Sequence, residues 1–231
     1  MKTQKVATMT TVLTLMLCFG LTMAHAVKPP TTTIDISSLA DTTWCGAPSG
    51  GYINCSTFPY GEQTYDGIPF LIPGNAEGTA NNVWNADQAG GGGSGTVSIT
   101  VPTNVAKVKT VYTLMNTYWG STQSGLLSIT FTGSAGATWT VSLVGGTNIR
   151  DYNQNGSTTD TILCQLPGAV GKTATVNAWV NNQGQRLDEQ VFELPVAFRT
   201  QTLVSMTITD SGNANEQRSF LAAVTVSTAL P

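Results

Sequence analysis

The stretch LSITFTGSAGATWTVSL, residues 127–143, shows the pattern that decides the fold. Apolar residues fall at every second position on both sides of a Gly- and Ser-rich interruption: Leu127, Ile129 and Phe131, then Trp139, Val141 and Leu143. Successive side chains of a β-strand point to opposite faces, so this alternation predicts two half-buried strands separated by a turn.

The same alternation recurs after residue 95, at 97–101, 162–166, 174–180, 192–198, 204–208 and 220–226. The segment KVKTVYTLMNTYWG, residues 107–120, is apolar on both faces, which predicts a central strand. Residues 27–88 add two short strands, IDISSL at 34–39 and GIPFLIP at 67–73. No window after residue 26 has a helical period, and Val, Ile and Thr fill the runs, so the chain is predicted to be all-β.

About nine strands at this spacing favour a two-sheet antiparallel β-sandwich over a closed barrel. The chain lacks the tryptophan framed by two distant bridged cysteines that marks antibody-type domains. A jelly roll is therefore the preferred topology. We expect a single domain over 27–231, with short strands, a disulfide loop and a Gly-rich loop in 27–95 and the main strands in 96–231.

The first 26 residues predict a secretory signal peptide. Lys2 and Lys5 precede a short apolar run, and AHA at 24–26 gives a small-x-small cleavage pattern. The apolar run is too short for a membrane span of about 20 residues, and no later stretch approaches one. We therefore expect an exported protein of bacterial type without a membrane span, either periplasmic or released.

Charge and rare residues exclude several functions. The net charge of −3 becomes more negative once the lysines of the signal peptide are removed, which argues against nucleic acid as a partner. The single histidine, His25, lies in the signal peptide, so the mature chain has no Ser-His-Asp or Cys-His machinery. Cys45 and Cys55 are predicted to form a disulfide, and Cys164 is predicted to be a buried thiol.

Aromatic residues beside polar loop residues indicate a sugar site. Sugar rings present C–H faces that stack on aromatic rings, while amide, guanidinium and carboxylate groups bind the hydroxyls. For Trp84 and Trp119, core and binding roles both stay open at this point, and an ion pair is the competing role for Arg150. The candidate carbohydrate-binding residues are Trp84, Asn116, Trp119, Arg150, Asp151 and Tyr152.

The segment DYNQNGSTTD, residues 151–160, raises the question of calcium. An EF-hand loop would need a glutamate at its twelfth position, where this chain has Ile162, and helices where it has predicted strands. Asn155 and Gly156 instead form a common turn pair. A structural Ca²⁺ held in an open loop by Asp151, Asn153, Asn155 and Asp160 stays an alternative, and no cofactor is otherwise required.

Several segments together resemble a known family. IDISSL, YDGIPFLIP, NNVWN, VYTLMNTYWG and RSFLAAVTV are similar to segments of the galactose-binding-like jelly rolls of bacterial secreted proteins, of the novel carbohydrate-binding module type. The best-matched residues, Gly67 to Phe70, belong to the scaffold in such domains. The resemblance implies a β-sandwich that binds carbohydrate at one edge, often with a structural Ca²⁺, and that has no catalysis of its own.

The sequence thus favours a secreted, non-enzymatic protein whose partner is a glycan or polysaccharide. One alternative is a glycan hydrolase or lyase that uses two of the acids at strand ends and loops. Another is a structural or adhesive cell-surface protein. The acids considered for the enzyme are Asp66, Asp87, Asp151, Asp160, Asp188, Glu189, Glu193 and Asp210. The sequence selects no pair among them, and it leaves the oligomeric state open.

Overall fold

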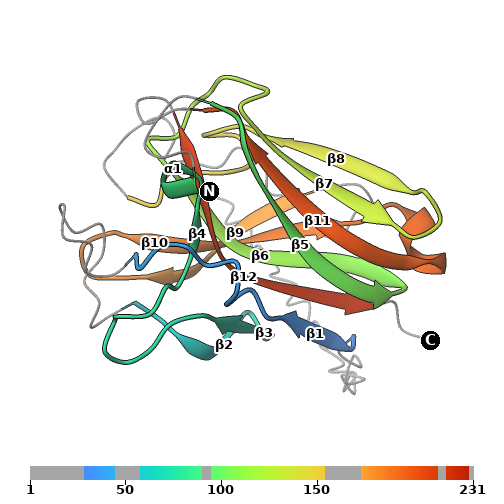
Figure 1. The fold of residues 1–231 in the computed structure, drawn as a ribbon, viewed down its shortest axis with the longest axis horizontal. Coiled ribbons are helices and arrows are strands. Elements are labelled where there is room, and N and C mark those ends of the chain that lie inside the picture. Colours follow the sequence, from blue (N-terminus) through green and yellow to red (C-terminus); the bar gives the residue numbers. More distant parts are fainter. Residues whose placement is uncertain (1–28, 45–57, 90–94, 154–172, 213–216, 229–231) are drawn as a thin grey trace, which may run out of the picture.

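The strands form two main antiparallel sheets and a separate hairpin (Figure 1). The computed structural model describes residues 29–44, 58–89, 95–153, 173–212 and 217–228. Its strands are β1 (Thr31–Ile34), β2 (Gly61–Tyr65), β3 (Ile68–Ile72), β4 (Trp84–Asn85), β5 (Val97–Ala106), β6 (Val108–Tyr118), β7 (Leu127–Gly133), β8 (Thr138–Leu143), β9 (Thr173–Val180), β10 (Arg186–Glu193), β11 (Thr202–Asp210) and β12 (Arg218–Thr228). Helical structure in these ranges is limited to α1 (Ala86–Ala89) and a 3₁₀ helix at Val196–Thr200. The prediction of an all-β chain is confirmed.

The first sheet has the order β1-β12-β6-β10-β9, and β4 also pairs with β12. The second sheet has the order β5-β11-β7-β8 and lies over the first in Figure 1. Four of the strand pairs are nested along the chain: β1 with β12, β5 with β11, β6 with β10, and β7 with β8. All of these pairs are antiparallel, so the fold is consistent with the predicted β-sandwich.

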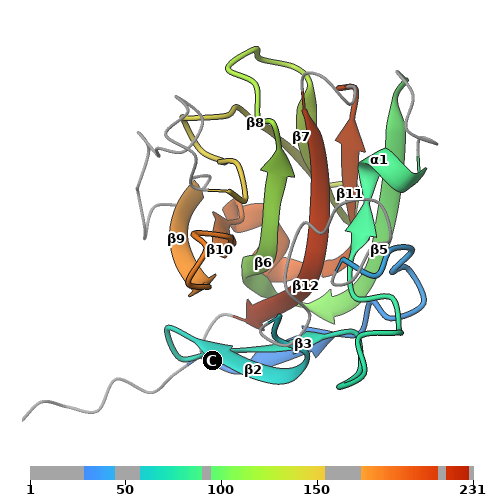
Figure 2. The same cartoon turned by 90° about the vertical axis from the view of Figure 1, so that its left-hand side faces the viewer.

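The interior between the two sheets holds the larger apolar core, to which both sheets contribute. A second apolar cluster lies on the outer side of the first sheet, where Trp44, Phe58, Phe70 and Phe220 are buried. The hairpin β2–β3 covers this side, because β3 packs on β12 and β1 (Figure 2).

Strand β6 contributes to both apolar regions. Val111 and Met115 lie in the interior core, whereas Leu114 and Tyr118 belong to the outer cluster. The strand sits between β12 and β10 in the middle of the first sheet. This confirms the prediction that residues 107–120 form a central strand that is apolar on both faces.

The structure corrects the strand predicted at 192–198. Strand β10 ends at Glu193, and the chain continues into the 3₁₀ helix at Val196–Thr200. Pro195 lacks an N–H and cannot continue a central ladder. Its carbonyl instead accepts a hydrogen bond from the Phe198 N–H at 3.0 Å.

The strand predicted at 34–39 lies earlier, at Thr31–Ile34. Asp35 Oδ1 accepts a hydrogen bond from the Ser37 N–H at 2.8 Å, which begins a turn in place of a strand. The predicted alternation of buried residues in β11, which began at Val204, also differs from the structure. The pairing register slips between Leu203 and Ser205, so that Leu203 rather than Val204 is buried.

Several predictions lie outside the described residues. Among them are the signal peptide at 1–26, the disulfide between Cys45 and Cys55, the strand at 162–166 with its buried Cys164, and the turn pair Asn155 and Gly156.

Candidate functional site

The segment that follows Ile149 is fixed at the end of the first sheet, between β6 and β10. The Thr117 N–H donates to the Arg150 carbonyl at 3.2 Å, and the Tyr152 N–H donates to the Thr117 carbonyl at 2.9 Å. On the other side, the Arg186 N–H donates to the Tyr152 carbonyl at 2.8 Å. Hydrogen bonds to β6 on one side and to β10 on the other therefore fix the backbone of residues 150–152.

Asp188 is the centre of a buried polar network. Its carboxylate accepts two hydrogen bonds from the Arg150 guanidinium, at 2.7 Å from Nε and 2.6 Å from a terminal nitrogen. Asn116 adds a third at 2.6 Å through Nδ2, and its Oδ1 accepts the Asp188 N–H at 2.9 Å. Arg150 also donates to Asn177. The Arg150 guanidinium and the Asp188 carboxylate therefore form a bidentate ion pair.

Two of the residues predicted to bind sugar, Asn116 and Arg150, belong to this network. The structure brings Asn116 and Arg150 together, but each side chain already binds Asp188. The Asp188 side chain is fully buried, and the Arg150 side chain is 14% exposed. Among the roles considered for Arg150, the structural ion pair is the one observed. The network joins β6, β10 and the segment after Ile149 through Asn116, Asp188 and Arg150, and it forms a buried frame at this end of the sandwich.

Asp151, Tyr152 and Trp84 are also buried. Asp151 Oδ1 accepts the Asn153 N–H at 2.8 Å, and its carbonyl accepts Arg186 Nε at 2.9 Å. The Tyr152 ring packs edge-on against Trp44, with ring centroids 5.1 Å apart. Trp84 lies in the interior core on β4, with 4% exposure. These three side chains hold the scaffold together and offer little surface to a ligand.

Trp119 differs from the other predicted residues because its side chain is 45% exposed. It directly follows β6, and its backbone has a φ of 54°, in the left-handed region that bulky residues rarely adopt. That conformation costs about 1–2 kcal/mol in an L-residue other than glycine. Such strain persists where the surrounding structure imposes it, and it is typical of functional sites.

The chain around Trp119 is held on both sides. Before it, the Tyr118 ring is buried and lies 5.6 Å from the Trp119 ring. After it, the Ser121 N–H donates to Gln217 Oε1 at 3.2 Å, and the Ser121 carbonyl accepts the Gly145 N–H at 2.8 Å. A side chain at Gly145 would come within 2.7 Å of that carbonyl, so glycine permits the close approach of the two loops.

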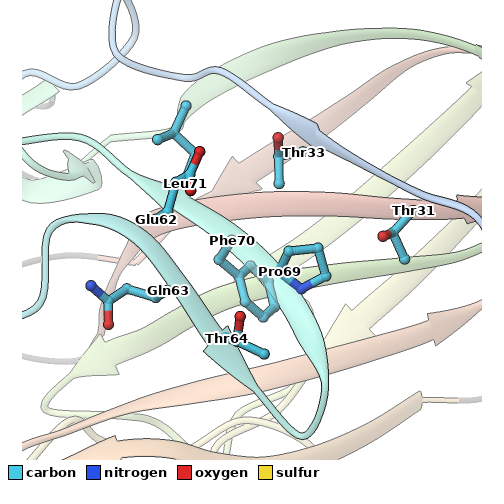
Figure 3. A pocket seen from close by; sticks show the side chains of 8 residues that line it. All are labelled: Thr31, Thr33, Glu62, Gln63, Thr64, Pro69, Phe70 and Leu71. Carbon is cyan, nitrogen blue, oxygen red and sulfur yellow. The ribbon is translucent and has the colours of Figure 1, made fainter.

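A pocket of about 310 Å³ lies elsewhere, between β1 and the hairpin β2–β3 (Figure 3). Phe70 is almost fully buried at its base. The other lining residues are Thr31, Thr33, Glu62, Gln63, Thr64, Pro69 and Leu71. None of the residues predicted for sugar binding lines it. No sequence pattern indicates this pocket, because it depends on how the hairpin packs against β1.

Glu189 is the acid with the most perturbed environment that we find. Burial, together with the smaller effect of the nearby Asp66 carboxylate, raises the pKa of its carboxyl from 4.5 to about 7. Its Oε2 has no hydrogen-bond partner, and the residue is 3% exposed. The two-carboxylate enzyme would need such a pair. A substrate, however, could not reach Glu189 in this arrangement.

Calcium binding stays a prediction. Asn155 and Asp160 lie outside the described residues. Asp151 Oδ1 accepts a hydrogen bond from the backbone N–H of Asn153. Within the described ranges, no group of three His, Cys, Asp or Glu side chains is placed to hold a metal ion. The same part of the chain contains no helix that is long and apolar enough to cross a membrane.

No protein-family model matches this chain, and no curated protein matches it. Sequence reasoning missed the role of Asp188 at the centre of the frame, although Asp188 was among the acids considered. The missing signal was the strand pairing that brings Asn116, Arg150 and Asp188 together from distant parts of the chain.

Proposed function

We propose that this protein is a secreted, non-enzymatic carbohydrate-binding protein of the galactose-binding-like jelly-roll type. The observation that carries the proposal is Trp119, an exposed aromatic ring that a strained backbone holds at the end of a rigid sandwich. An indole fixed in this way offers a flat apolar face for the C–H groups of a sugar ring. Little conformational entropy is lost on binding, because the site is already formed.

The strand pairing supports the jelly-roll part of the proposal. A jelly roll has eight strands in two sheets and is built from two Greek keys. Folding one long antiparallel ribbon gives nested pairs, and β1–β12, β5–β11, β6–β10 and β7–β8 are nested in this way. Strand β9 is then an addition at the edge beside β10.

Polar groups near Trp119 support a polyhydroxylated ligand. The residues after it, Gly120 to Gln123, read GSTQ, and Thr122 and Gln123 are exposed. Hydroxyl and amide groups bind sugar hydroxyls without requiring a charged ligand. The buried frame of Arg150, Asp188 and Asn116 keeps the neighbouring backbone in place. No cofactor is required in this proposal, and export would follow from the N-terminal segment.

A glycan array and polysaccharide pull-down with the wild type and Trp119→Ala test this function. We expect the wild type to bind at least one glycan class, and Trp119→Ala to lose that binding without a lower melting temperature. Tyr60→Ala is the matched control, because Tyr60 is 43% exposed and lies beside the pocket strands rather than at this end. Absence of any glycan binding, or equal loss in both variants, would refute the role of Trp119.

A further inference from the structure

The outer side of the second sheet carries an ordered array of hydroxyl groups. The strand registers align its outward residues in rows that cross all four strands. Every outward position in three successive rows is threonine or serine, except Pro102. The rows are Ser98, Thr209, Ser128 and Ser142; Thr100, Thr207, Thr130 and Thr140; and Pro102, Ser205, Thr132 and Thr138. We call these positions the hydroxyl face.

Neighbouring side chains of the hydroxyl face bind one another. Hydroxyl pairs lie 3.0 Å apart between Ser98 and Thr209, 3.0 Å between Thr100 and Thr207, and 2.9 Å between Thr130 and Thr140. These contacts, together with the restricted χ1 of β-branched residues, limit side-chain rotation. The hydroxyl and methyl groups are therefore held in a regular arrangement before any partner binds.

The composition of this face narrows the class of partner. It contains no charged residue, so neither an ionic polymer nor a charged protein surface finds a complementary charge. It also contains no aromatic side chain, so sugar rings find no stacking partner. What the face offers is a two-dimensional repeat, about 4.8 Å between strands and about 6.7 Å between alternate residues of one strand.

We propose that the hydroxyl face binds ice. A crystal of water is an uncharged lattice of hydrogen-bond donors and acceptors whose surface repeats in two dimensions, as the hydroxyl face does. Threonine supplies a hydroxyl for the lattice oxygens and a methyl group that fits between them. Strands in a sheet rotate by about 20° relative to their neighbours, which confines flat contact mainly to the central strands β11 and β7.

The substitutions that test this proposal are Thr207→Lys and Thr130→Lys. Both residues are half-buried at the centre of the hydroxyl face, one on β11 and one on β7. A lysine there would project a hydrated charge into the contact. Thr64→Lys is the matched control, since Thr64 is an exposed strand threonine on β2, outside this face. Circular dichroism and thermal unfolding identify any variant that fails to fold.

The measurement is partition of labelled protein into a slowly growing ice hemisphere, together with inhibition of ice recrystallisation. We expect the wild type, Thr64→Lys and Trp119→Ala to enter the ice, and Thr207→Lys and Thr130→Lys to be excluded like a non-binding reference protein. Exclusion of the wild type would overturn the proposal. So would retention on crystalline cellulose or chitin that depends on Thr207 without any binding to ice, which would assign the face to polysaccharide. The Trp119 variant separates this outcome from failure of the proposed sugar site.

Discussion

The outer faces of the two sheets differ sharply, although the same alternation of apolar and polar residues produces both sheets. The outer face of the first sheet is covered by the hairpin β2–β3 and by a cluster of aromatic rings. The outer face of the second sheet is the hydroxyl face, with exposed threonine and serine on its edge strands β5 and β8. One sheet therefore has two buried sides and the other has one.

This difference decides where charge can be buried. Polar groups on or beside the covered sheet leave water and need partners there, as Asp188 finds in Arg150 and Asn116. Polar groups on the hydroxyl face keep access to water, so their hydrogen bonds contribute little to stability. Substitutions on the first sheet should thus have large effects, and matched substitutions on the second should have small ones.

The largest effect is expected for Asp188→Ala. The substitution removes the acceptor of the Arg150 and Asn116 hydrogen bonds and leaves the guanidinium largely buried without its carboxylate. Breaking a buried ion pair in this way costs about 3–5 kcal/mol of unfolding free energy. Urea denaturation measures the change. Glu62→Ala is the control, because Glu62 is exposed, and equal stability of the two variants would contradict the role of the network.

The next effect is a pH dependence from Glu189. Its pKa is raised from 4.5 to about 7, so between these values the folded protein binds more protons than the unfolded chain. Stability therefore falls as pH rises through this range, by an amount on the order of 2–3 kcal/mol for such a shift. Above pH 7 this contribution stays constant.

Glu189→Gln tests that dependence, because glutamine keeps the shape of the protonated acid and does not ionise. We expect the variant to be more stable than the wild type at pH 8 and similar to it near pH 4. Unfolding curves measured across this range provide the check. A wild type whose stability rises between pH 5 and 7, with Glu189→Gln following the same curve, would show that Glu189 is not the responsible group.

A smaller effect is expected at Thr175, with a matched threonine on the second sheet as its control. Thr175 is buried on β9, and its hydroxyl binds Gln190 at 2.6 Å and the Asn148 carbonyl at 2.9 Å. Thr175→Val leaves a buried partner unsatisfied, which costs about 1–3 kcal/mol. Thr140→Val on the exposed hydroxyl face should change stability by less than about 0.5 kcal/mol. Equal losses of unfolding free energy in Thr175→Val and Thr140→Val would contradict the proposed difference between the two sheets.

Much of the fold was predictable because it depends on local alternation. The strands at 97–101, 127–131 and 139–143 and the two-sided strand at 107–120 follow from periodicity. The errors have local causes with long-range consequences. The strand ends before Pro195 although the apolar alternation continues to Phe198, and a one-residue slip in β11 places Leu203 rather than Val204 in the core.

The candidate site was less predictable, because pairing across the sheet sets the role of each residue. Arg150 and Asp188 are 38 positions apart, and Asn116 and Asp188 are 72 apart, so no local pattern links them. Trp84 and Trp119 both sit among polar residues in the sequence, yet one lies in the core and the other is exposed. Only the exposed fraction of the side chain distinguishes the structural Trp84 from Trp119, the candidate sugar-binding tryptophan.

The most direct test of sugar binding at Trp119 is collisional quenching of tryptophan fluorescence by acrylamide, with and without a bound oligosaccharide. Trp119 is 45% exposed, Trp44 and Trp84 are buried, and Trp139 and Trp179 are partly buried. The part of the quenching that is lost in Trp119→Phe therefore comes from Trp119. We predict that a glycan found on the array lowers quenching in the wild type and has no effect in Trp119→Phe. Binding of that glycan with unchanged quenching of the wild type would contradict the account, because the sugar would then lie away from Trp119.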